Sequence, residues 1–253
     1  MNMDLWVATF FAFCRIASFL YFLPFFSGRS MPAMVKITFG LGLSVTVADK
    51  VNISHIETIW DIVGYAGTQI VIGLTLSKIV EFLWNIPKMA GHILDFDIGL
   101  SQASLFDVNA GAQSTLISTM FDIFFTIIFI ALGGMDYFVA TILKSFQYTE
   151  AISQLLTKSF LDSLLATLLF AITSAVEIAL PLMGCLFIIN FVLILIAKNA
   201  PQLNIFANAY VLKITCGILF IAMSVPMFGY VFKNVTNELL DEYTKLFDFL
   251  LTK

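Results

Sequence analysis

Long apolar segments separated by short polar connections dominate the chain. Read in windows of about 20 residues, the length of a membrane-spanning helix, the sequence has apolar segments at residues 5–23, 37–48, 62–83, 120–143, 163–197 and 211–232. Their apolar residues run continuously and do not alternate with a period of two, which argues against a membrane β-barrel. We therefore predict an all-α integral membrane protein with about six apolar helical segments.

Two of these segments contain residues that could interrupt a helix, and a more polar tail follows the last segment. As one helix, segment 163–197 would be ~52 Å long against a hydrocarbon core of ~30 Å, so we expect a break at Pro181, followed by Gly184. The pair Gly133-Gly134 suits either close helix packing or a hinge. Residues 234–253 predict an amphipathic tail with apolar positions at helical spacing: Leu239, Leu240, Tyr243, Leu246, Phe247 and Leu250.

The composition agrees with a membrane environment. Of the 253 residues, 60% are hydrophobic and 12% are charged, too few to cover the outside of a soluble protein. Lipid or partner chains must therefore cover the rest. The formal net charge of -4 offers no basic surface for nucleic acid. Lysine or arginine occurs in nearly every connection, so the positive-inside rule does not choose an orientation.

The sequence offers no catalytic machinery. Cys14, Cys185 and Cys216 lie inside apolar runs and are interpreted as buried small side chains, and His55 and His92 lack the spacing of metal ligands. A nucleophile with its base, and a glycine-rich phosphate loop with its lysine, are both missing from the sequence. We expect no enzyme activity, no cofactor and no metal.

Three ionisable residues fall inside apolar segments, where charges are costly. Arg15, Asp122 and Glu177 have two interpretations: a coupling site such as a proton relay, or an ion pair or hydrogen bond to another subunit. Lys78 and Glu81, three residues apart, can neutralise each other on one helical turn.

Three stretches carry a resemblance to a known family. They are Leu23-Pro24-Phe25-Phe26 with Arg29, Pro32 and Lys36, preceded by Arg15; Ala90-Gly91-His92 with Gly99-Leu100-Ser101, Ala103, Phe106-Asp107 and Gly111; and Leu180-Pro181 with Asn190 and the run Ala200-Pro201-Gln202-Leu203-Asn204-Ile205-Phe206. Together they resemble the FliR family of flagellar type III export-gate subunits, which is related to the T-type subunits of virulence injectisomes. The middle stretch resembles the flagellar version more.

This resemblance implies a structural, pore-forming subunit of the flagellar type III protein export gate, needed for flagellum assembly. It implies a multi-pass protein of the bacterial inner (cytoplasmic) membrane and the flagellar basal body, in a helical hetero-oligomer with FliP-like and FliQ-like subunits beside an FlhB-like subunit. Unfolded flagellar subunits would be the cargo. Residues 1–150 would be a FliP-like part, and 151–253 a FliQ-like helical hairpin with the amphipathic tail. The alternatives are an injectisome T-type subunit and an autonomous secondary transporter, which a discontinuous helix at Pro181 would suit.

The resemblance also assigns candidate residues. The loop that plugs the pore would contain Gly99, Leu100, Leu105, Phe106 and Gly111, with Leu105 and Phe106 as an apolar seal that excludes water and ions; alternatively, Phe106 packs in a helix interface. Gln102 and Leu105 stand where the family often has aromatic residues. The remaining motif residues would be structural or subunit contacts: Arg15, Pro24, Arg29, Pro32, Glu177, Pro181, Pro201, Gln202 and Asn204.

Overall fold

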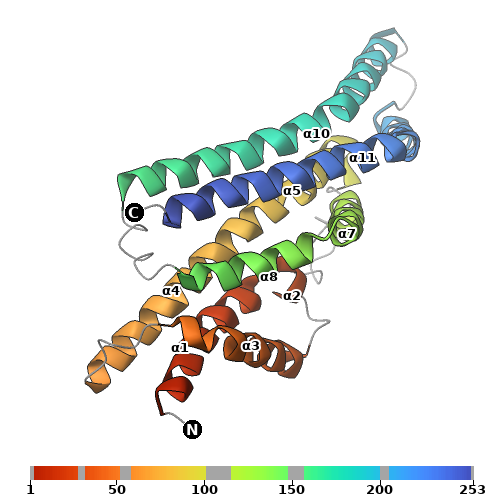
Figure 1. Ribbon diagram of the computed structural model, residues 1–253. Coiled ribbons are helices and arrows are strands. Elements are labelled where there is room, and N and C mark those ends of the chain that lie inside the picture. Colours follow the sequence, from red (N-terminus) through yellow and green to blue (C-terminus); the bar gives the residue numbers. More distant parts are fainter. Residues whose placement is uncertain are drawn as a thin grey trace. The chain divides into compact units, whose positions relative to one another are not determined.

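The computed structural model is helical and describes residues 3–27, 32–51, 58–100, 115–147, 157–199 and 205–251 (Figure 1). No strand occurs among these residues, which confirms the predicted all-α class. The helices are α1 (Met3–Phe22), α2 (Pro24–Ser27), α3 (Ala33–Val47), η1 (Ala48–Lys50), α4 (Ile59–Trp84), α5 (Ile86–Ile98), α7 (Leu116–Ala131), α8 (Gly134–Lys144), η2 (Ser145–Gln147), α10 (Lys158–Asn199) and α11 (Ile205–Leu251).

Several of these helices are long and apolar enough to cross a membrane. Within the described ranges there are four such helices, α1, α4, α10 and α11, and a fifth span if the bent pair α7 and α8 is counted as one. The six predicted apolar segments thus all correspond to helices. The second corresponds to α3, whose 15 residues reach only about 22 Å and fall short of the hydrocarbon core.

The predicted break at Pro181 is wrong. Pro181 lies inside α10, one helix of 42 residues. A proline removes a single backbone hydrogen bond, whereas ending a helix exposes several unsatisfied groups that lipid cannot solvate. The chain is instead interrupted at Gly133, whose positive φ of 76° ends α7 and caps α8. The two helices meet there at 71°. The bend does not test whether the glycine pair acts as a hinge, so that interpretation stays a prediction.

The chain divides into two compact units, each of which is assembled from segments distant in sequence. Unit 1 comprises residues 1–84, 132–168 and 238–253, and unit 2 comprises residues 85–131 and 169–237. These units are defined by packing within the chain and do not test the division at residues 150 and 151, which concerns resemblance to partner subunits. That division stays a prediction.

In unit 1, α1 packs against α3 and α4 (Figure 1). The backbones of α1 and α4 approach closely at Gly73, where a Cβ atom would lie 2.3 Å from the carbonyl oxygen of Arg15. The predicted tail is the end of α11. Its apolar face is buried at Leu239, Tyr243, Leu246 and Phe247, and the Tyr243 ring contacts Phe138 of α8 at 5.6 Å between centroids.

In unit 2, α5 packs against α7. The contact between α7 and α11 is aromatic. The ring centroid of Phe121 on α7 lies 4.7 Å from that of Phe228 and 5.3 Å from that of Phe232, both on α11. Phe125 also contacts Phe232. These rings are fully buried, so α5, α7 and the matching part of α11 form a packed frame at both ends of the predicted plug loop.

Candidate functional site

The predicted plug loop leaves the frame of unit 2 at Gly99. Gly99 has φ 96° and ends α5, and its N–H donates to the carbonyl oxygens of Asp95 and Phe96 at 3.1 and 3.2 Å. This left-handed conformation is one that glycine adopts without steric cost. Leu100 follows, half-buried. The other predicted loop residues, Leu105, Phe106 and Gly111, lie outside the described residues, so the apolar seal stays a prediction.

The chain re-enters the frame at Thr115, where a buried carboxylate holds the start of α7. Asp95 has no exposed surface. Its two oxygens accept the backbone N–H groups of Ile117 at 3.1 Å and of Ser118 at 2.9 Å, and the hydroxyl of Thr115. The first N–H groups of a helix have no partner within the helix, and negative charge is stabilised there. Asp95 therefore caps α7 from the neighbouring helix.

Two further residues of α5 tighten this contact. At Gly91 the helices approach so closely that a Cβ atom would lie 2.4 Å from Cα of Ser118. At the next residue, the ring nitrogens of His92 lie 3.2 and 3.3 Å from the hydroxyl oxygens of Thr115 and Ser118. Both ends of the loop are therefore attached to the same face of α5.

The end of α5 is also attached to α11. Nζ of Lys213 lies 3.7 Å from a carboxylate oxygen of Asp97, and both side chains are about one-quarter exposed or less. Four residues further along α11, a Cβ atom on Gly217 would lie 2.8 Å from the Ile98 side chain. Lys213 and Gly217 thus mark a close contact of α11 with the turn that precedes the loop.

The polar residues of this frame lie at the two described ends of the predicted loop. Their polar groups are engaged in capping or pairing, and no group of three or more metal-ligating side chains occurs among the described residues. Neither Asp95 nor Asp97 stands out in the sequence as a candidate residue. A capping residue is recognised when it directly precedes its helix, but Asp95 caps a helix that begins about twenty positions later, which only the fold reveals.

In unit 1, Arg15 joins three segments of the chain. Arg15 is 2% exposed. Its guanidinium donates to Oε1 of Gln69 at 2.7 Å and to the carbonyl oxygen of Ser145 at 2.6 Å, and its Cζ lies 4.4 Å from the centroid of the Phe146 ring. Buried charge requires such compensation. Arg15 is thus bonded to neutral partners within this chain, and the contact with another subunit predicted for it stays a prediction.

The other predicted contact residues are placed individually. Pro24 begins α2, exposed Pro32 precedes α3, and Glu177 and Pro181 are exposed on α10. Asp122 is half-buried on α7. Lys78 and Glu81 form the predicted pair, with Nζ and Oε2 2.6 Å apart. The motif residues Arg29, Pro201, Gln202 and Asn204 lie outside the described residues.

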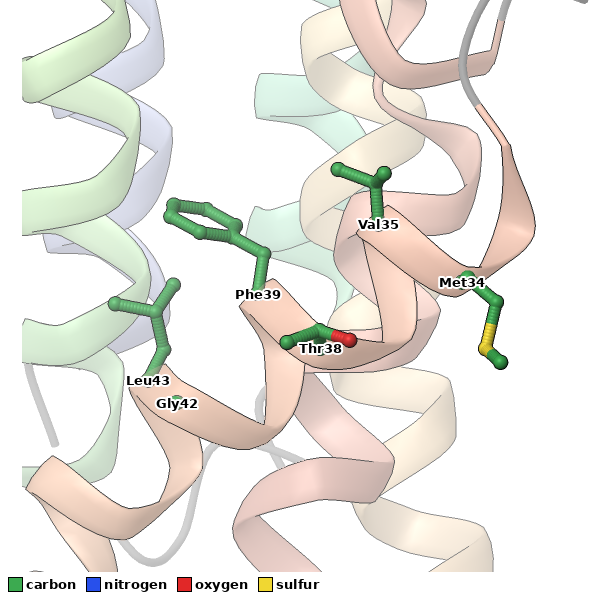
Figure 2. Close-up of a pocket in the computed structure, with 6 residues that line it drawn as sticks. All are labelled: Met34, Val35, Thr38, Phe39, Gly42 and Leu43. Atoms are coloured by element: carbon green, nitrogen blue, oxygen red, sulfur yellow. The ribbon is translucent and has the colours of Figure 1, made fainter.

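One face of α3 is hollowed and almost entirely apolar. The hollow has a volume of about 570 Å³ and is lined by Met34, Val35, Thr38, Phe39, Gly42 and Leu43. Figure 2 shows Val35, Phe39 and Leu43 projecting from the same side of the helix. Because the lining contains one hydroxyl and is otherwise apolar, this face suits contact with lipid or another helix.

Comparisons with known proteins cover nearly the whole chain. Residues 6–239 match the family described as "Bacterial export proteins, family 1". The flagellar biosynthetic protein FliR of Aquifex aeolicus is 24% identical over 242 residues, 95% of this chain and 92% of that protein. The protein of the same name from Bacillus subtilis is 26% identical over 246 residues, 92% of this chain and 91% of its own length. The secretion system apparatus protein SsaT of Salmonella typhimurium is 25% identical over 223 residues, 85% of each chain.

Proposed function

The chain belongs to family 1 of the bacterial export proteins, and from this membership we propose that it is a structural subunit of the flagellar type III protein export gate. The observation that carries the proposal is similarity along the whole chain. The family match spans residues 6–239, and relatives with the name FliR cover more than nine-tenths of this chain. The membrane-spanning helices agree with such a role.

The frame around Asp95 supports a gate more than a transporter. An apolar constriction stops water and ions by dewetting, and unfolded peptide can displace it. A plug of this kind needs rigid ends, because a loop that drifted from the pore axis would not seal. Asp95 and Gly99 fix those ends on α5. We propose that the loop between Leu100 and Thr115 is the plug, with Leu105 and Phe106 as its seal.

The proposed setting is the bacterial cytoplasmic membrane, within a hetero-oligomer. We propose FliP-like and FliQ-like subunits as direct partners and an FlhB-like subunit beside them, with unfolded flagellar subunits as cargo. The many large apolar side chains that are exposed on α3, α10 and α11 support extensive contact with other apolar helices or lipid. A family of export proteins supports a non-enzymatic role.

The proposal is tested by deleting the gene and by purifying the tagged chain, expressed from its native locus, in mild detergent. Loss of swimming and of flagellar subunits in the medium, both restored by the wild-type gene, is the expected result. FliP-like and FliQ-like chains should co-purify in fixed ratio. A folded, monodisperse chain that purifies alone from a strain with intact motility would refute the proposal and favour an autonomous transporter.

A second candidate function is injectisome secretion, because the secretion system apparatus protein SsaT is 25% identical to this chain, although over a shorter part of it than the flagellar relatives. The deletion strain separates the two. Loss of secreted virulence effectors with normal swimming would assign the chain to an injectisome, whereas loss of swimming with normal effector secretion would assign it to the flagellum.

A further inference from the structure

Glu177 is an exposed carboxylate near the middle of α10. This helix is long and apolar enough to cross a membrane, and its most apolar stretch directly follows Glu177. At 1.5 Å per residue, Glu177 lies about 22 Å along the helix from Asp162 and about 31 Å from Lys198, the flanking charged residues. No other charged residue lies between Asp162 and Lys198, so the Glu177 carboxylate is the one charge in a stretch of about 54 Å, which is longer than a hydrocarbon core of about 30 Å.

The same position carries a second acceptor without a donor. In an α-helix the carbonyl oxygen of residue 177 accepts the N–H of residue 181. Residue 181 is proline, which has no N–H. The carbonyl oxygen and the carboxylate of Glu177 therefore both lack their usual partners. In the part of the chain that the structure describes, no side chain donates to this carboxylate.

Glu177 belongs to an exposed stripe on α10. Positions spaced by three or four residues share one helix face, and five such positions in a row are exposed here: Thr173, Glu177, Pro181, Gly184 and Ile188. Ser174, at the edge of this stripe, is buried. A Cβ atom on Gly184 would meet nothing within 4 Å, which leaves room for a second helix to approach. The opposite face, with Ala175, Ala179, Leu182 and Leu186, is buried within the chain.

The carboxylate and the carbonyl oxygen of Glu177 indicate the chemistry of a partner that would bind this stripe. Two acceptors close together in an apolar surrounding require a cationic donor with several N–H groups. A second copy of this chain is poorly suited to supply one, because the basic residues inside its own apolar segments are engaged: Arg15 with Gln69 and Ser145, Lys78 with Glu81, and Lys213 with Asp97.

We propose that the stripe around Glu177 is the docking surface for an apolar helix of another gate subunit that carries an arginine or lysine at the depth of Glu177. The proposal rests on the proposed function and adds the chemistry of the partner. Pairing there would satisfy the carboxylate and the carbonyl oxygen at once and would fix the height of the partner helix against α10, because a shift by one turn would separate the charges.

The first test is photo-crosslinking in the native membrane. A photoreactive residue replaces Ile188, on the stripe, or Ile172, which is exposed but about 140° around the helix from Glu177. Position 188 should capture a FliP-like or FliQ-like chain within two turns of an arginine or lysine in an apolar helix, and position 172 should not capture that peptide. Capture of lipid alone, or of a second copy of this chain, at position 188 would overturn the proposal.

The second test exchanges the charges. Glu177→Lys should lower co-purification of the captured subunit and export of flagellar subunits at least tenfold, and replacing the partner's basic residue by glutamate should restore both. Glu177→Leu should also lose the partner, since it leaves the cation unpaired. Normal recovery and export with Glu177→Leu would overturn the inference.

A control variant and the wild-type chain separate the possible failures. Glu81→Gln removes an equal charge from an exposed pair, and should leave recovery and export within twofold of wild type. If the wild-type chain does not recover gate subunits, the proposed function fails. If it does, and Glu177→Leu recovers them equally, only the docking surface is refuted.

Discussion

Replacing Asp95 by alanine removes the cap that holds α7 to α5. The change deletes two acceptors at 3.1 and 2.9 Å from the N–H groups of Ile117 and Ser118, and leaves those groups buried without a partner. Losing an N-cap lowers the free energy of unfolding by about 1 kcal/mol. Leaving a buried N–H group without its acceptor lowers it by about 1–3 kcal/mol. We expect a total near 3 kcal/mol, or about a hundredfold in the local folding equilibrium.

The matched comparison is Asp97→Ala, two residues along the same helix. It removes the same charge, but its partner Lys213 lies at 3.7 Å and both side chains are partly exposed, so the expected cost is about 1 kcal/mol or less. The native cysteines Cys14, Cys185 and Cys216 are free and half-buried. Their reaction with a thiol-specific fluorophore during heating would report unfolding of the purified assembly.

Asp95→Ala should lower the unfolding midpoint by several degrees more than Asp97→Ala. Asp95→Asn keeps one acceptor and should fall between them. Midpoints that are equal, or an Asp97→Ala variant that is the less stable, would show that the cap does not hold the loop ends and would refute this account of the frame.

Three further variants test other contacts. Gly91→Ala should prevent assembly or export, because its Cβ would lie 2.4 Å from Cα of Ser118, a backbone atom that cannot move aside; recovery of the assembly measures this. Arg15→Ala should reduce the amount of chain in the membrane at least tenfold on immunoblots, because Arg15 joins three segments. Leu105→Gly combined with Phe106→Gly should make cells leak small ions through the idle gate, measured as ion flux in cells with assembled gates.

Each of these variants has a control. Gly64→Ala should be tolerated, since a Cβ atom there meets nothing within 4 Å; equal loss in Gly64→Ala and Gly91→Ala would show that helix glycines are sensitive irrespective of packing. Arg15→Lys should recover part of the lost chain, and full recovery would mean that charge alone matters at this position. Unchanged ion permeability with normal assembly would remove Leu105 and Phe106 from the pore lining.

Much of the fold could be predicted from hydrophobic runs alone, because lipid demands continuous apolar helices. The helical class and the six apolar segments followed from this requirement. The position of the interruption did not, since the rule that proline breaks helices holds best in water, where the freed groups are solvated. In α10 the helix continues through Pro181, whereas at Gly133 the chain needs a positive φ.

The contacts that hold the two ends of the loop could not be predicted from the sequence, for a different reason. Asp95 and Asp97 are separated by one residue and look equivalent as polar positions in a mixed stretch. In the fold they point to different helices: Asp95 caps α7 and Asp97 pairs with Lys213 of α11. Such roles depend on which helices are neighbours. Because most of these helices are apolar on nearly all faces, their sequences do not indicate which helices pack together.

Helix packing also decides which of the charges inside the apolar segments have partners within the chain. Arg15 and Lys213 find their partners within the chain, so they serve the fold of a single subunit. Glu177 faces outward on α10 beside a carbonyl oxygen that Pro181 leaves without a donor. An unpaired carboxylate in such a place is costly in a membrane, and pairing with another chain would remove that cost. The place where this subunit looks least satisfied is therefore the place where its assembly with other subunits can best be tested.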